Sequence, residues 1–148
     1  MMQLEQIMLM EQHSTNDIAT PLGNECTVDI SYAGTPSPDG KPWPYEITYT
    51  IKIIPAAQTD AVHEPGGDAE EPAPKFKVAL HYAARFSSED GLAHDDALKA
   101  EASTAWPYAR ADFVQVFRLH GMPSDLIPAI PDLYVNQRTD NSDPASGL

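Results

Sequence analysis

The chain has 148 residues, enough for one domain with a modest hydrophobic core. Its formal net charge of -13 repels nucleic-acid phosphates and anionic lipid headgroups, so we expect neither as a partner. Cys26 is the sole cysteine, which excludes an internal disulfide and fits a reducing compartment. The first residues lack the basic and apolar regions of a secretory signal, and no stretch approaches the roughly 18–20 apolar residues of a membrane helix. We therefore expect a cytoplasmic protein.

Four stretches in the first 86 residues have the pattern of strands. Residues 26–32, 45–54 and 75–86 alternate apolar and polar side chains with a period of two, and residues 3–11 do so less regularly. One apolar and one polar face on each strand favours an antiparallel sheet over a parallel one, which is buried on both faces. The sequence therefore predicts a four-stranded antiparallel sheet.

Two connections between these strands differ in character. The connection at 34–44 contains Pro38-Asp39-Gly40, which is typical of a turn between neighbouring strands. Residues 58–74 are rich in Pro, Gly, Ala and acidic side chains and carry no pattern that could bury a face, so they predict a mobile acidic loop. We expect a single domain over residues 1–138 and a disordered polar tail over residues 139–148.

After residue 86 the pattern changes to that of helices. Residues 92–102 favour a first helix, and Ser103 or Thr104 can begin a second one with Pro107 in its first turn, where the missing N–H is harmless. The second helix should reach His120 and stop at Gly121. One face of it is apolar: Trp106, Ala109, Phe113, Val116, Phe117 and His120. Strands followed by helices indicate an α+β fold, and one helix covers a small sheet poorly, which favours oligomerisation.

No constellation of residues indicates an enzyme, a metal site or a bound cofactor. The five histidines have no ligand spacing among themselves or with Cys26, so structural or solvated roles are expected for all of them: His13, His63, His81, His94 and His120. His94-Asp95-Asp96 could suggest part of a metal site, but aspartate is an ordinary capping residue at the start of a helix. The sequence also has no glycine-rich phosphate loop and no nucleophile elbow.

The segment that follows the helix, residues 122–134, is strongly apolar but contains three prolines. It cannot form a regular helix or strand throughout, and two interpretations stay open. Exposed, it would be an adhesive surface for extended peptides; packed back, it would belong to the core. Its apolar residues are Leu126, Ile127, Ile130, Leu133 and Tyr134.

The sequence at 106–130 resembles a known family. It reads Trp-Pro-Tyr-Ala-Arg at 106–110, about ten helical residues, a Gly, a Pro, and Leu-Ile-Pro-Ala-Ile at 126–130. This order is similar to that of the SecB protein-export chaperones, and the predicted strands come in the order of that family. The resemblance implies a homotetramer built as a dimer of dimers. It also implies ATP-independent binding of unfolded client polypeptides, which export members pass to SecA.

The resemblance also assigns roles to residues of this chain. Client binding would fall to Leu126, Ile127, Ile130, Leu133 and Tyr134, and an oligomer interface would use Trp106, Phe113, Val116 and Phe117. The chain departs from the family in its short connection at 13–25, its longer loop at 58–74 and its C-terminal segment after Ile130, which supports only a turn or two of helix. An adaptor, or a chaperone specific for an antitoxin, with no role in general export, is the alternative.

Overall fold

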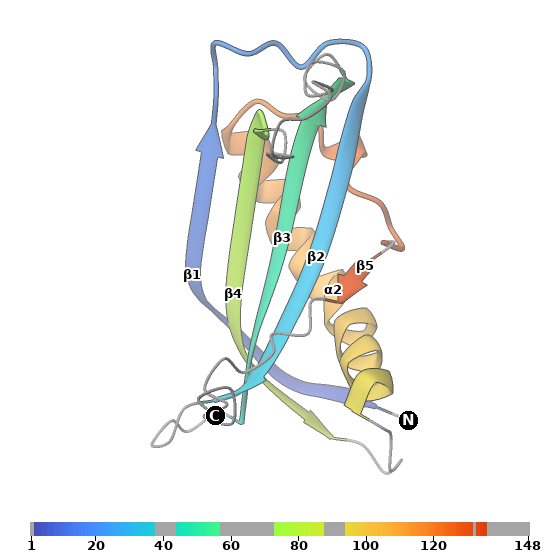
Figure 1. Cartoon of the computed structure of the whole chain (residues 1–148). Coiled ribbons are helices and arrows are strands. Elements are labelled where there is room, and N and C mark those ends of the chain that lie inside the picture. Colours follow the sequence, from blue (N-terminus) through green and yellow to red (C-terminus); the bar gives the residue numbers. More distant parts are fainter. Residues whose placement is uncertain (1, 38–43, 57–72, 88–93, 132, 136–148) are drawn as a thin grey trace, which may run out of the picture.

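The computed structural model describes residues 2–37, 44–56, 73–87, 94–131 and 133–135. In this part of the chain, one long helix packs on one face of a single sheet (Figure 1). The sheet has the strand order β1-β4-β3-β2-β5. Its first four strands are antiparallel, and β5 runs parallel to β2. The elements are β1 (Gln3–Asn16), β2 (Cys26–Pro36), β3 (Tyr45–Pro55), β4 (Phe76–Ser87), α2 (His94–Leu119), the 3-10 helix η1 (Ser124–Leu126) and β5 (Leu133–Val135). The predicted α+β fold, four antiparallel strands followed by a long helix, is confirmed.

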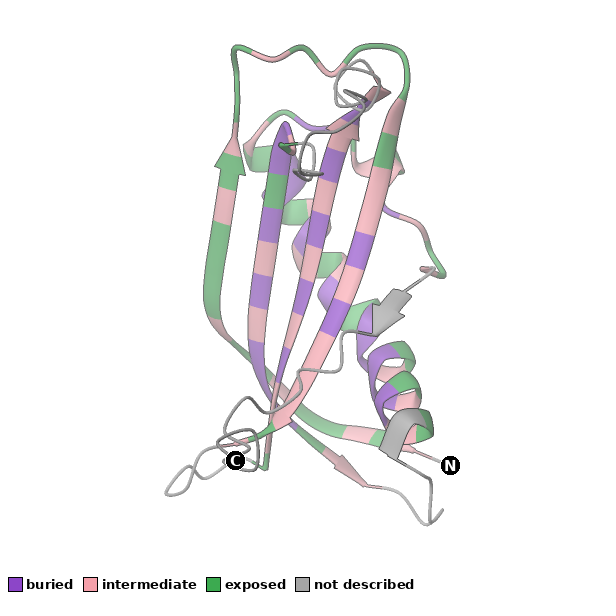
Figure 2. Cartoon of the chain, viewed as in Figure 1, coloured by how far each residue is buried: buried purple, intermediate pink, exposed green. Residues whose placement is uncertain are grey.

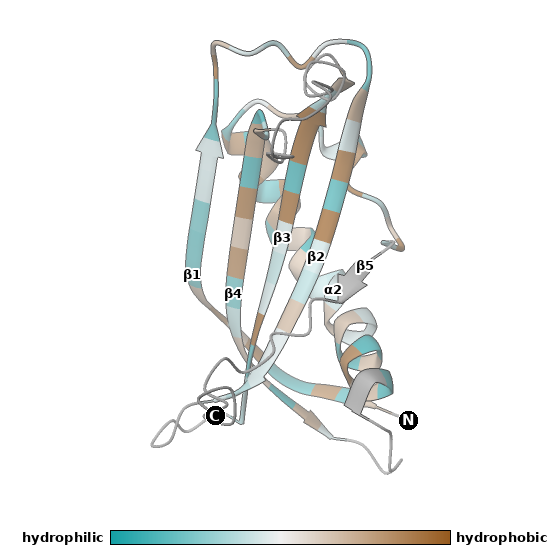
Figure 3. Cartoon of the chain, in the orientation of Figure 1, coloured by the Kyte–Doolittle hydropathy of each residue, from teal (hydrophilic) through white to brown (hydrophobic). Residues whose placement is uncertain are grey.

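The alternating residues of β2, β3 and β4 divide between the two faces of the sheet as their pattern predicted. Figure 2 shows buried residues recurring at every second position along β3, and Figure 3 shows hydrophobic bands separated by pale or hydrophilic ones on the same strand. The face that carries them packs against α2 and forms the core together with the helix. Its largest fully buried side chains are Trp106, Tyr32, Tyr49, Tyr82, Phe76, Phe113, Phe117, Ile47, Ile51, Ile53, Leu80 and Ile127.

Strand β1 is longer than its apolar pattern indicated, because it continues to Asn16. Its last residues are polar, and they join the sheet through pairs such as Ser14 with Val78 and Asn16 with Phe76. Backbone pairing does not require an apolar side chain, so the pattern underestimates the strand. Two register shifts interrupt the pairing with β4, which accounts for the blurred alternation in this segment.

The two predicted helices are one, since α2 runs without interruption from His94 to Leu119 with Pro107 inside it. The prediction that a new helix begins at Ser103 or Thr104 was therefore wrong. A proline in a helix interior has no N–H to donate to the carbonyl four residues earlier. In α2 the carbonyl left without this donor is that of Ser103. Ser103 and Pro107 both lie on the exposed side of α2, where water can supply that donor.

The end of α2 is the glycine stop that the sequence predicted. Gly121 has a φ of 69°, and its N–H donates to the carbonyl of Arg118 at 3.1 Å. The N–H of Met122 donates to the carbonyl of Phe117 at 2.8 Å, which completes a Schellman motif. Met122 is buried beside the core, so this stop also turns the chain back onto the sheet.

Three buried tyrosines of the sheet hold α2 by their hydroxyls. Tyr49 donates to the carbonyl of Ala102 at 2.5 Å, and Tyr82 donates to Asp112 Oδ2 at 2.8 Å. Tyr32 donates to Oε2 of the buried Glu101 at 3.5 Å. Burial raises the pKa of all three phenols well above the usual value, and the acceptor carboxylates of Tyr32 and Tyr82 raise it further. These polar contacts select one position of the helix on an otherwise apolar face.

Where the sequence predicted a turn or two of helix after Ile130, residues 133–135 form the strand β5; residues 132 and 136–138 lie outside the described part of the chain. β5 pairs with β2 at Ile30, Ser31 and Tyr32, because the edge of β2 offers backbone partners that a sequence pattern does not reveal. The turn chemistry at 38–40, nearly all of the acidic loop at 58–74 and the tail at 139–148 lie outside the described residues. β2 and β3 are neighbours as predicted, and Ser37 N–H donates to the carbonyl of Pro44 at 2.9 Å.

Candidate functional site

Two side chains of α2 hold the proline-rich segment that follows the helix. Trp106 donates from Nε1 to the carbonyl of Ala129 at 3.1 Å. Arg110 donates from Nε to the carbonyl of Pro128 at 3.2 Å and from Nη2 to that of Ile127 at 3.3 Å. Three successive carbonyls are therefore bound by the first and last residues of the Trp-Pro-Tyr-Ala-Arg motif. We call residues 127–130 the tethered segment.

The tethered segment presents its two isoleucines to opposite environments. Ile127 is 2% exposed and belongs to the core, whereas Ile130 is 89% exposed. Leu126, just before them, is half-buried and packs against the core. The backbone bends at Ile127, Ala129 and Ile130, so the two isoleucines need not face the same way. The structure thus packs Ile127 into the core and leaves Ile130 exposed.

The remaining predicted client-binding residues, Leu133 and Tyr134, lie in β5. Their Cα partners on β2 are Ile30 and Ser31. All five predicted client-binding residues thus lie between the end of η1 and β5. They divide into buried, exposed and strand-paired residues along the chain.

The residues predicted for an oligomer interface lie in the core of one chain. Trp106, Phe113, Val116 and Phe117 are each at most 3% exposed, covered by the sheet on which α2 packs. Phe117 meets the ring of Phe76 edge-on at 5.0 Å between centroids. Their side chains leave no surface for a second chain, so a contact between chains would have to use other residues.

The side of α2 that faces away from the sheet carries exposed apolar residues. Tyr108 is 54% exposed and Leu119 is 80% exposed, and they lie three helical turns apart. Elsewhere, Ile18 in the connection from β1 to β2 is 88% exposed, and Met8 and Leu9 are exposed on β1. Ile130 and Ile18 are the most exposed of the large apolar residues among those described.

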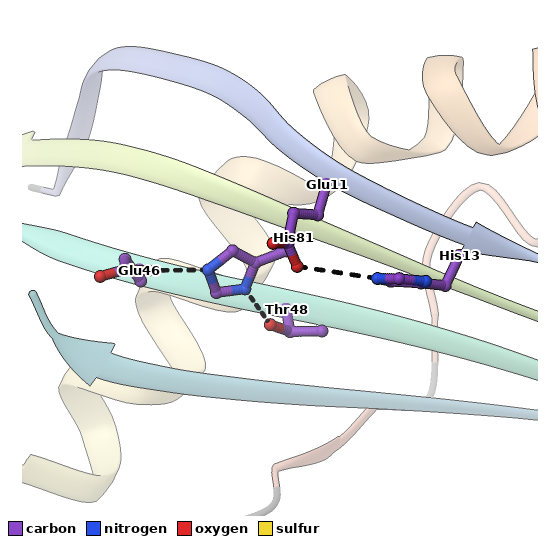
Figure 4. Close-up of polar contacts among 5 residues, drawn as sticks. All are labelled: Glu11, His13, Glu46, Thr48 and His81. Carbon is purple, nitrogen blue, oxygen red and sulfur yellow. Dashed lines mark hydrogen bonds and ion pairs between the residues drawn. The ribbon is translucent and has the colours of Figure 1, made fainter.

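Histidine and glutamate side chains gather on the face of the sheet opposite α2 (Figure 4). His81 contacts Glu46 Oε1 through Nε2 at 2.8 Å and Thr48 Oγ1 through Nδ1 at 2.6 Å. His13 Nε2 lies 3.7 Å from Glu11 Oε2 at the more exposed side of the cluster. With Glu46 ionised, Nε2 of His81 donates to it and Nδ1 accepts from Thr48, so His81 links β4 to β3.

His120 has a structural role of the kind expected for it. Its Nε2 lies 2.9 Å from Ser14 Oγ, and its ring meets that of Phe76 edge-on at 5.1 Å. It therefore connects the end of α2 to β1 and β4. Across the described part of the chain, no three His, Cys, Asp or Glu residues are grouped so that they could hold a metal ion. In the same part, no helix has the length and apolar character needed to cross a membrane.

The role of Arg110 was not predicted from the sequence, because Arg110 is not one of the apolar residues that mark the buried face of the helix. A guanidinium has five donors and suits consecutive carbonyl acceptors, and prolines leave a segment short of its own donors. An arginine and a tryptophan four residues apart on a helix, followed by a proline-rich apolar segment, were the available indication. The spacing places both side chains on the same face of the helix.

Comparison with known proteins shows a similarity of fold. The chain matches no protein-family model and no curated protein sequence. A solved structure of a SecB-like chaperone from Mycobacterium tuberculosis (Rv1957), in complex with a ChAD peptide from the HigA1 antitoxin, aligns over 91% of this chain and 91% of its own chain. The TM-score is 0.52 and the sequence identity 16%, so the likeness concerns the fold. The resemblance drawn from the 106–130 segment is thus confirmed for its architecture: the chain has the fold of a SecB-like chaperone.

Proposed function

We propose that this protein is an ATP-independent holding chaperone that binds unfolded or extended polypeptides through apolar surface beside the tethered segment. The observation that carries the proposal is the exposure of Ile130, 89%, on a segment whose carbonyls are bound by Trp106 and Arg110. Exposing a large apolar side chain on a constrained segment serves binding better than folding. Holding a client requires no catalytic group, and the net charge of -13 keeps such a surface in solution.

The shared fold supports this proposal from a second direction. The similar protein from Mycobacterium tuberculosis is a SecB-like chaperone solved with a peptide bound. For this chain we propose clients of the same chemical kind, extended apolar polypeptide. Since that peptide comes from an antitoxin, a chaperone dedicated to one antitoxin is the second candidate. General export, with transfer of clients to SecA in the cytoplasm, is the first.

A homotetramer, a dimer of dimers, forms part of the proposal. Tyr108 and Leu119 lie on the side of α2 away from the sheet, and covering them would remove exposed apolar surface from water. Light scattering should give a mass of about 65 kDa, four times the 16.2 kDa of one chain. A mass of 16.2 kDa would refute the assembly.

The test of client binding is an aggregation assay with an unfolded preprotein. The wild-type chain should delay the rise in light scattering, and Ile130→Asp should lose most of that effect without a change in the free energy of unfolding. Ile18→Asp is the matched control, because Ile18 is 88% exposed and lies outside the tethered segment. If the wild-type chain gives no delay, the protein is not a holding chaperone. If Ile130→Asp protects as well as wild type, the client surface lies elsewhere.

A pull-down separates the two candidate roles. Binding of purified SecA supports export, whereas binding of one antitoxin peptide with no general protection supports the dedicated chaperone. An adaptor that has lost client binding would show neither activity, and the exposure of Ile130 disfavours it.

A further inference from the structure

The outer edge of β2 is occupied by the chain's own β5. The partners are Ile30 with Leu133, Ser31 with Tyr134 and Tyr32 with Val135, and the two strands run in the same direction. β5 lies at the end of the sheet, beyond β2 (Figure 1). β2 has eleven residues and β5 has three, so β5 covers only a part of this edge. An edge strand with free backbone groups is a template on which an extended peptide can pair.

The pairing of β5 with β2 is the weakest in the sheet. It comprises three residue pairs, whereas β2 pairs with β3 over eleven. A parallel pair is also slightly less stable per residue than an antiparallel one. Short, terminal pairings of this kind open locally at a small free-energy cost while the rest of the fold stays intact.

The occupant has the chemistry of a client segment. Leu133, Tyr134 and Val135 are a run of apolar and β-forming residues in extended conformation, joined to the exposed Ile130 by a short stretch. An unfolded polypeptide that adds a strand to β2 at Ile30–Tyr32 would need the same backbone donors and acceptors. Both segments cannot use them at once.

We propose that β5 is an intramolecular competitor: an extended apolar client adds to the edge of β2 as a parallel strand only after β5 has left it. This inference rests on the proposed chaperone function and specifies where and in which direction the client binds. It also changes the role of Leu133 and Tyr134: they belong to the strand that competes with the client and do not themselves bind the client. The affinity for a client is then reduced by the fraction of molecules in which β5 is displaced.

The test uses the segment itself as the probe. A fluorescent peptide of residues 129–137 is titrated by anisotropy with the full chain, a chain ending at Pro131 and a control chain ending at Gln137. The chain ending at Pro131 should bind the peptide at least about tenfold more tightly than the full chain, because a short tether gives β5 a high effective concentration. The chain ending at Gln137 keeps β5 and should behave like the full chain. Equal affinity in all three proteins would overturn the proposal.

A disulfide lock tests the same idea without truncation. Ser31→Cys and Tyr134→Cys, in a Cys26→Ser background, place a cysteine pair on neighbouring strands, whose spacing of about 4.8 Å suits a disulfide. Oxidation should abolish peptide binding and reduction should restore it to the level of the full chain. Peptide binding that is the same in both redox states would contradict the role of β5.

The aggregation assay distinguishes the two hypotheses. If the chain ending at Pro131 protects an unfolded preprotein but binds the peptide no better than the full chain, the competitor role fails and the chaperone function stands. If the truncated chain binds the peptide but no form of the protein protects the preprotein, the chaperone function fails and the competition at β2 stands.

Discussion

Replacing Arg110 by methionine tests whether α2 orients the tethered segment. The variant keeps the aliphatic stem and removes the guanidinium, so the carbonyls of Ile127 and Pro128 lose their donors. Hydrogen bonds to charged groups are worth about 1.5–3 kcal/mol each when well formed. At 3.2 and 3.3 Å these two are longer than the charge-assisted optimum of about 2.7–2.9 Å, so we expect about 1–2 kcal/mol for the pair.

The corresponding measurement is amide hydrogen exchange in residues 124–130. A loss of about 1.4 kcal/mol corresponds to roughly tenfold faster exchange at the amide of the buried Ile127, which donates to the carbonyl of Ser124 at 3.1 Å and is released when the segment opens. Arg118→Met is the matched control, because this substitution removes the same charge from an exposed residue in the last turn of α2. Exchange of the segment should be unchanged in this control. If Arg110→Met exchanges at the wild-type rate, the tether does not hold the segment.

Three further predictions concern the core, the alkaline limit and the helix stop. Phe117→Ala should lower the free energy of unfolding in urea by about 3–5 kcal/mol because Phe117 is fully buried, and a loss under 1 kcal/mol would contradict that packing. Above pH 10 the unfolded state should lose phenolic protons that the folded state retains, so stability present below pH 10 is lost as the pH rises, by about 1.4 kcal/mol per pH unit for each group. The groups are Tyr32, Tyr49 and Tyr82. The part of the absorbance change at 295 nm that belongs to three of the six tyrosines should therefore coincide with the loss of circular dichroism, and ionisation of all six in an intact fold would refute the burial. Gly121→Ala should cost about 1–2 kcal/mol from the left-handed backbone alone, since nothing lies within 4 Å of an added Cβ; an unchanged urea midpoint would argue against that strain.

The strands could be predicted because they are half-buried. Tyr49 and Ile51 face α2 while Thr48 and Thr50 face away, and a period of two follows directly from that geometry. The extension of β1 to Asn16 could not be predicted from the sequence, because its last residues are held by backbone pairing with β4. The continuity of α2 through Pro107 depends on that residue lying on the exposed side, which only the packing decides.

The candidate site was only partly predictable for a similar reason. Ile127 and Ile130 are chemically alike and three residues apart, and their opposite exposures follow from the bonds that Trp106 and Arg110 make. The pairing of β5 joins residues about a hundred positions apart in the sequence, and three residues carry no periodicity to reveal it. Local pattern identified the right segment, whereas long-range contacts determine what each of its residues does.

The position of β1 at the far side of β4 has a consequence for synthesis on the ribosome. Met8 pairs opposite Ala83, so the first strand has no partner until 75 further residues have been added. At about 5–20 residues per second this takes roughly 4–15 s. During that interval the run Ile7-Met8-Leu9-Met10 is an unpaired apolar strand on a nascent chain, the kind of segment that aggregates. A protein that we propose to shield such segments in its clients therefore exposes an apolar segment of its own, residues 7–10, while it is being synthesised.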